Sequence, residues 1–139
     1  MDTKFSVAVH LLILISESPT PMNSDQMAGS VGTNASYVRK VLALLQKADI
    51  VRGQRGIGGY SLLIPTEHLT LLQIYQAVTE EAGIHLLDIH RNPNDRCTVG
   101  RYIRPVLTDM FADMEDTFAR SLADKTLADC IADIRKRME

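Results

Sequence analysis

The sequence predicts a mainly α-helical fold with one small β-hairpin. Apolar residues recur at helical spacing through most of the 139 residues, so helices should account for most of the chain. One stretch breaks this pattern, because RGQRGIGGYSL at 52–62 places four glycines between two short β-prone runs. The segment before it has the clearest helical period, and a long helical pattern occupies the last third. The expected order is therefore short helices, a hairpin and then a long helix.

The N-terminal run FSVAVHLLILIS predicts a helix that is apolar nearly all round. Such a helix is buried on more than one side, within a core or between the core and a partner subunit. Pro19 and Pro21 end it. The run is interrupted by His10 and closed by Glu17, so it is too short to span a bilayer, and no small-residue cleavage site follows. We therefore expect a cytoplasmic protein that makes no use of a membrane.

A helix-turn-helix is expected in the next segment. Asn23 or Ser24 can cap a short helix, GTN at 32–34 supplies a turn with a new cap, and ASYVRKVLALLQKA follows. Its apolar residues Val38, Val41, Leu42 and Leu45 fall on one face, while the opposite face is polar and basic. The hairpin comes directly after this second helix, which is the order of a winged helix-turn-helix.

The glycine-rich loop allows three interpretations: a phosphate cradle for a nucleotide, a hairpin tip laid against nucleic acid, or an ordinary tight turn. A nucleotide loop needs a preceding hydrophobic strand, Lys-Ser or Lys-Thr after its last glycine, and a helix that opens there. None of these features is present. The order of elements favours the wing, with Arg55 entering a minor groove and Tyr60 packed under the hairpin.

Exposed polar residues of the two helices and the wing are the expected DNA contacts. They are Ser24, Thr33, Asn34, Ser36, Tyr37, Arg39, Lys40, Arg52, Arg55, Gly56 and Gly58. The charge is distributed in the same sense, although weakly: residues 1–64 carry six Lys and Arg against four Asp and Glu (+2), and residues 65–139 carry nine against thirteen (−4).

The second half predicts a different role. Residues 69–80 should form a helix that covers the hairpin through Leu71, Ile74, Tyr75 and Val78. A connecting segment at 81–97 leads to a long helix from Thr98 to about Leu122, which Pro105 either begins or kinks, and to a last helix at 125–137.

Two apolar stripes on the long helix are more than one small core requires, so we expect it to pack against a second copy. The expected dimerisation residues are Val99, Ile103, Val106, Leu107, Met110 and Met114. The chain then divides into a winged helix-turn-helix domain at 1–80, a connecting or sensor segment at 81–97, and dimerisation helices at 98–139.

Cys97 is the expected sensor residue. It follows Arg96 and precedes the long helix, where the helix N-terminus and the guanidinium would both favour a thiolate. An equally simple interpretation is a small apolar residue at a helix start. Cys130 has the spacing of a core residue, and two cysteines alone favour a reducing compartment.

Taken together, the motifs resemble the Rrf-two family of bacterial transcription regulators, which includes the IscR, NsrR and CymR types, and within it the YwnA-type branch. The resemblance rests on NASYVRKVLALLQKADIV at 34–51 and RGIGGYSL at 55–62. It extends to LTLLQIYQAV, which ends at residue 78, and to NPNDRCTVG at 92–100. It implies a winged helix-turn-helix that binds double-stranded DNA as a homodimer.

The same resemblance raises the question of an iron-sulfur cluster, which some members hold with three cysteines of the connecting segment. Here that segment offers only Cys97, with His85 and His90 nearby, and Ser6 stands where some relatives place an acidic ligand. We expect no cofactor, because thiolates dominate such sites.

The expected function is thus that of a sequence-specific DNA-binding transcription regulator, a homodimeric repressor with a redox-sensing thiol at Cys97. An iron-sulfur sensor on the same scaffold, or a regulator that binds a metabolic enzyme, are the alternatives. No nucleophile-base pair or metal-ligand spacing favours an enzyme. The sequence leaves open the operator and whether the signal is a small molecule or a redox change.

Overall fold

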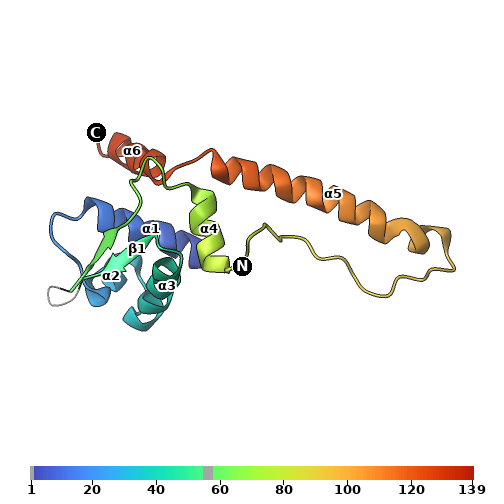
Figure 1. Cartoon of the computed structure of the whole chain (residues 1–139), viewed down its shortest axis with the longest axis horizontal. Coiled ribbons are helices and arrows are strands. Elements are labelled where there is room, and N and C mark those ends of the chain that lie inside the picture. Colours follow the sequence, from blue (N-terminus) through green and yellow to red (C-terminus); the bar gives the residue numbers. More distant parts are fainter. Residues whose placement is uncertain (1, 55–57) are drawn as a thin grey trace.

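A computed structural model describes residues 2–54 and 58–139 and contains six helices and one hairpin in that part of the chain (Figure 1). The helices are α1 (Lys4–Glu17), α2 (Ser24–Val31), α3 (Ala35–Lys47), α4 (Leu71–Thr79), α5 (Thr98–Ala123) and α6 (Leu127–Arg137). The strands are β1 (Val51–Gly53) and β2 (Tyr60–Leu62). The predicted fold class, mainly helical with a small hairpin, is confirmed.

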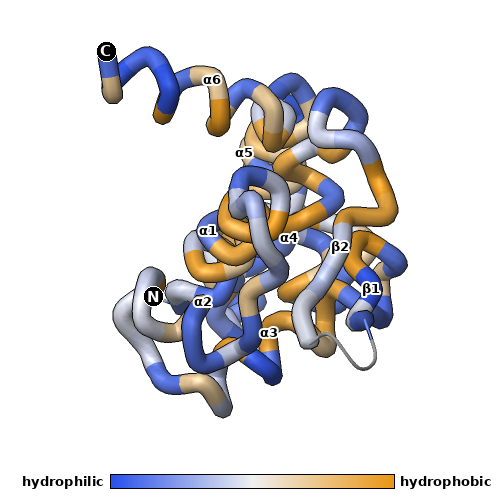
Figure 2. Tube along the Cα trace, turned by 90° about the vertical axis from the view of Figure 1, so that its left-hand side faces the viewer, coloured by the Kyte–Doolittle hydropathy of each residue, from blue (hydrophilic) through white to orange (hydrophobic). Residues whose placement is uncertain are grey.

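The core forms around α1, which packs against α2, α3, α4, α6 and β2. Leu11 and Leu12 are fully buried, and Figure 2 shows α1 among the other elements, with apolar stretches along it. The helix is apolar on several sides because it has neighbours on several sides. We call the compact part of the described molecule, residues 2–54 and 58–79 together with α6, the head.

Capping residues set the helix starts. The Asn23 side chain accepts from the Gln26 backbone N–H while the Gln26 side chain accepts from that of Asn23, which closes a capping box on α2. Thr70 with Gln73 closes another on α4. These reciprocal bonds satisfy donors that a helix start would otherwise leave without partners.

The expectation that α4 covers the hairpin is wrong. The helix packs against α1, α3 and α5, whereas β2 lies against α1 and β1 against α3. Its buried residues Ile74, Ala77 and Val78 therefore join the helical core. The predicted amphipathic helix is present, but its apolar face packs against other helices and not against the hairpin.

The last third leaves the head and then returns to it. Helix α5 projects away, and the connecting segment runs out beside it (Figure 1). Pro105 lies inside α5 and does not begin it. Helix α6 then packs on α1, with Leu127 fully buried and Ile131 nearly so, and an Arg135–Glu17 ion pair of 2.7 Å closes the contact.

Candidate nucleic-acid interface

The turn between α2 and α3 is built from a glycine and an asparagine cap. Gly32 adopts the left-handed conformation (φ 82°), and its N–H donates to the Ala28 carbonyl. Asn34 then caps α3 by accepting from the Tyr37 N–H at 2.8 Å. The Arg39 guanidinium donates to the Ser24 hydroxyl at 3.3 Å across the two helices. These contacts fix α3 against α2, as a helix-turn-helix requires.

The outward face of α3 carries its exposed polar groups. Ser36, Arg39 and Lys40 are exposed, while Val38, Val41, Leu42 and Leu45 are buried on the other side. Tyr37 is half-buried and packs against the core, so only part of its side chain is free to contact a ligand. Thr33 is also half-buried. The face is polar and carries two positive charges, those of Arg39 and Lys40.

The wing is a two-stranded antiparallel hairpin. Val51 pairs with Leu62, Arg52 with Ser61 and Gly53 with Tyr60, and the Gln54 N–H donates to the Gly59 carbonyl. Arg52 and Gly58 are exposed. Arg55 and Gly56, two of the predicted contacts, lie outside the described residues.

A hollow of about 450 Å³ joins the first helix of the motif to the wing. Ser24 and Gly58 line it, so two predicted contacts from separate elements meet there. Asn23, Gln46 and Gln54 line it as well, and sequence reasoning missed them. Side-chain amides both donate and accept hydrogen bonds, which suits phosphates and base edges alike. The sequence signal that could have indicated these three residues was their polar side chains, next to the ends of the helices and the wing.

Cys97 occupies the N-cap of α5 and is exposed. The backbone N–H groups of Gly100 and Val99 point toward its sulfur and lower the pKa of the thiol, without completing a capping hydrogen bond. The backbone at the helix start, rather than the Arg96 guanidinium, gives this direction. Gly100 is required there, because a Cβ at that position would overlap the Asn94 carbonyl oxygen.

Cys130 is less buried than its spacing suggested. Its side chain is half-buried on α6, and burial together with Asp129 and Asp133 raises the pKa of its thiol. Cys97 is therefore the more reactive of the two cysteines.

The donor set of one chain does not fit an iron-sulfur cluster. Cys97 caps the start of α5 and Cys130 lies on α6, so the 26 residues of α5 separate the two cysteines in the chain. Ser6 donates to the Thr3 carbonyl, and His10 lies 3.1 Å from the Ser30 hydroxyl. Across residues 2–54 and 58–139, no three His, Cys, Asp or Glu side chains gather as metal ligands.

An apolar stripe on α5 faces away from the rest of the chain. Val99, Val106, Met110 and Met114 are 68, 46, 54 and 56 % exposed, and Ile103 and Leu107 are half-buried. Tyr102, which the sequence reasoning did not select, is 56 % exposed beside them. We call these seven residues the α5 stripe. Such a run of exposed apolar side chains marks an interaction surface.

Comparison with known proteins agrees with this geometry. The family model described as an iron-dependent transcriptional regulator, Rrf2 (Rrf-two), matches residues 1–133. The chain belongs to the Rrf2 family. It is 36 % identical over 129 residues to YwnA of Bacillus subtilis (strain 168), a candidate HTH-type transcriptional regulator, with 93 % of this chain and 95 % of YwnA covered.

Solved structures place the Rrf2 chain among winged-helix proteins. A candidate DNA-binding protein of 34 % identity superposes with a TM-score of 0.76, covering 92 % of this chain and 98 % of that one. IscR of T. potens, at 20 % identity, gives 0.73 with coverages of 100 and 90 %, which shows a shared fold.

The Rrf2 family consists of transcription regulators, so this chain is a transcription regulator and not an enzyme. The resemblance expected from its motifs is confirmed. Among the described helices, none combines the length and the apolar character needed to cross a membrane.

Proposed function

We propose that this Rrf2 protein is a homodimeric repressor that binds a pseudo-palindromic DNA operator through α3 and the wing. The observation that supports it most is the exposed basic face of α3, held by its caps and by the Arg39–Ser24 bond beside the hollow that leads to the wing. Arg39 and Lys40 would contact bases and phosphates, and Ser36 would bond either.

The second copy would pack on the α5 stripe. Dimerisation removes this apolar area from water and sets the distance between the two copies of α3. The division into a DNA-binding domain at 1–80, a sensor segment at 81–97 and dimerisation helices at 98–139 belongs to this proposal. Because α6 packs on α1, dimerisation would be the task of α5.

Oxidation of Cys97 would supply the switch. The thiol is exposed, its pKa is lowered, and it lies at the start of the helix that would form the dimer. Conversion of a thiolate to a sulfenic acid by a peroxide would alter that helix start.

The test is fluorescence anisotropy with fragments of the DNA upstream of the protein's own coding region, across a salt series. Arg39→Ala should weaken specific binding by about 1–3 kcal/mol, because Arg39 would contact a base. Arg137→Ala removes the same charge from α6, outside the proposed interface, and should leave the affinity unchanged. Equal affinities for Arg39→Ala and Arg137→Ala would contradict the role of α3.

The same assay tests the switch. Mild peroxide should abolish specific binding by the parent protein and leave binding by Cys97→Ser unchanged. Equal loss in both proteins would exclude Cys97 as the sensor.

A further inference from the structure

A pocket of about 470 Å³ lies where the head meets α5. Its walls come from four parts of the chain: the start of α1, the second half of α4, the last third of α5 and Leu86 of the connecting segment. Its volume falls within the range of roughly 300–1,000 Å³ that is typical of small-molecule sites. The pocket is separate from the face of α3 that would contact DNA.

Three aromatic rings belong to the apolar wall. The Phe5 and Tyr75 ring centroids are 5.4 Å apart with planes at 76°, and those of Tyr75 and Phe118 are 5.9 Å apart at 84°. Each pair is edge-to-face, a favourable geometry that keeps the rings in place. Val78 and Leu86 complete the apolar lining, and Leu86 is 48 % exposed. A flat apolar guest would find contacts with rings from α1, α4 and α5.

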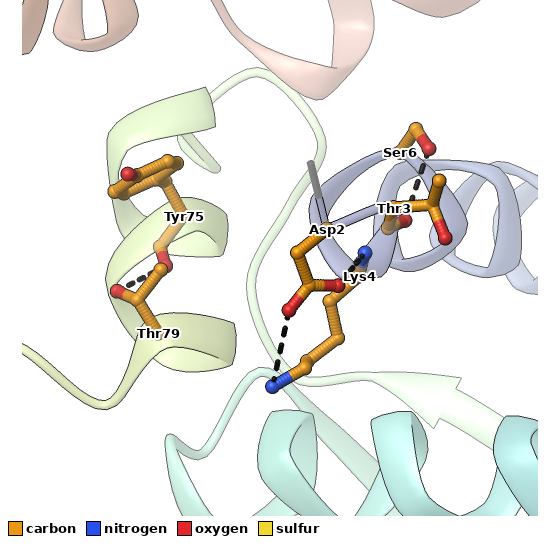
Figure 3. A network of polar contacts seen from close by, with 6 residues as sticks. All are labelled: Asp2, Thr3, Lys4, Ser6, Tyr75 and Thr79. Carbon is orange, nitrogen blue, oxygen red and sulfur yellow. Dashed lines mark hydrogen bonds and ion pairs between the residues drawn. The ribbon is translucent and has the colours of Figure 1, made fainter. Parts of the chain in front are cut away.

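The polar edge of the pocket is formed by Asp2, Lys4 and Thr79 (Figure 3). The Asp2 carboxylate accepts from the Lys4 backbone N–H at 2.8 Å, whereas its ion pair with the Lys4 ammonium is longer, at 3.6 Å. Thr79 donates to the Tyr75 carbonyl. Since an ammonium group has three donors, Lys4 can bind a further anionic oxygen, against the repulsion of the Asp2 carboxylate at the same edge.

We propose that this pocket binds a small aromatic carboxylate, which acts as the effector of the regulator. The ring would pack among Phe5, Tyr75 and Phe118, and the carboxylate would pair with Lys4. Since the guest would touch α1 and α4 on one side and α5 and Leu86 on the other, it fixes the angle between the head and α5. Helix α3 packs on α1 and α4 of the head. The angle between the head and α5 therefore sets the orientation of α3 relative to α5. The effector role rests on the proposed function, whereas binding does not.

Binding is tested by titration calorimetry of the full chain with phenylacetate. Benzyl alcohol, which lacks the carboxylate, and acetate, which lacks the ring, are the comparison probes. We expect saturable binding of phenylacetate at least tenfold tighter than either. Lys4→Met should reduce the affinity for phenylacetate to that for benzyl alcohol. Lys47→Met, on α3, should leave the affinity for phenylacetate unchanged.

Filling the pocket provides the second test. Leu86→Trp should abolish binding, while Leu87→Trp, the next residue of the same segment and not part of the pocket lining, should leave it intact. Circular dichroism tests whether both variants fold. If Leu86→Trp does not fold, Leu86→Phe replaces it. Absence of saturable binding, or equal binding by the Leu86 and Leu87 variants, would overturn the proposal.

Coupling is measured by repeating the DNA titration with phenylacetate at saturation. The operator Kd should change by about fivefold or more in the parent protein and stay constant in Leu86→Trp. Binding without any change in operator Kd would overturn the effector role. Failure to bind any DNA while phenylacetate still binds would remove the proposed function and leave the pocket assignment standing.

Discussion

Two neighbouring glycines of the wing are under different constraints. Gly58 has φ 66°, and a Cβ there would meet nothing within 4 Å. Gly59 has φ 122°, and a Cβ there would lie 2.6 Å from Cβ of Pro21. The first glycine is needed for its backbone conformation alone, while the second also lets the hairpin approach the segment between α1 and α2.

Gly59→Ala should therefore cost about 3 kcal/mol of folding free energy, because it combines a strained backbone with a collision. Gly58→Ala should cost about 1 kcal/mol, the penalty of a left-handed conformation. Urea unfolding of the two variants measures the difference. Equal losses would show that Pro21 yields to the added methyl group.

Individual residues could be predicted where a local pattern determines them. Ser36, Arg39 and Lys40 were expected on the free face of α3 from spacing alone, and they are exposed. The Gly59–Pro21 contact joins segments far apart in the chain, which spacing cannot reveal. Gln46 and Gln54 were missed for the same reason, since only folding brings them to one hollow.

The α5 stripe leads to a prediction about assembly. Val106→Glu with Met110→Glu would place two unpaired charges in the proposed dimer contact, and burying such charges costs several kcal/mol each. The dimer dissociation constant should rise by about a hundredfold or more. Thr108→Glu is the control, because Thr108 is exposed on the opposite side of α5. Sedimentation equilibrium measures all three proteins, and unchanged assembly of the double variant would place the dimer contact elsewhere.

The connecting segment is held to α5 by a carboxylate. The backbone N–H groups of Leu86 and Leu87 both donate to Glu115, which lowers the pKa of that carboxyl. The hydrogen bond and charge of Asp88 raise the pKa of His85, with smaller effects from Glu115 and Glu81. The Glu115 contact is complete above the ordinary Glu pKa of 4.5 and is lost as the pH falls through its lowered value.

The His85 contact changes in the opposite sense: it is complete below the ordinary His pKa of 6.5 and is lost as the pH rises through its raised value. The Glu115 contact, which joins the segment to α5, should thus be complete above pH 4.5, whereas the His85–Asp88 contact, which lies within the segment, should be complete below pH 6.5. Amide NMR shifts of Leu86 and Leu87 should titrate together in acid with a midpoint below 4.5, and Glu115→Gln should remove that titration. Independent midpoints for the two amides would contradict a shared acceptor.

The helices themselves were predicted better than the elements against which they pack. The caps and periods of α2 and α3 are local, so both helices could be predicted from the sequence, whereas the last helix was expected at 125–137 and begins at Leu127. The partner of α4 could not, because an amphipathic face specifies that something covers it and not what. From the sequence, Pro105 could either begin the long helix or kink it. In the structure Pro105 lies inside α5, which begins at Thr98.

At the scale of the whole molecule, the head is closed by a helix from the other end of the chain. The Leu127 N–H donates to the Leu69 carbonyl at 2.8 Å, the Leu71 N–H to the Lys125 carbonyl at 2.9 Å, and Leu127 is fully buried. The backbone around the start of α6 is thereby tied to the segment that precedes α4.

Leu127→Ala should destabilise the entire head by about 2–5 kcal/mol, because it leaves a cavity in the shared core. Ile134→Ala, at a position that is 44 % exposed on the same helix, should cost less than about 1 kcal/mol. Hydrogen exchange of the α1 amides distinguishes a shared core from a separate one. If α6 were an independent unit, exchange in α1 would not respond to Leu127→Ala.

The return of α6 also orders events during protein synthesis. The segment that carries α3 leaves the ribosome well before residues 127–131, yet the core beneath α3 lacks Leu127 and Ile131 until they emerge. A nascent chain therefore completes α5 before its head can close. Competence to occupy an operator would be gained only once α6 has emerged, when the helix that would recruit a second copy has already been made.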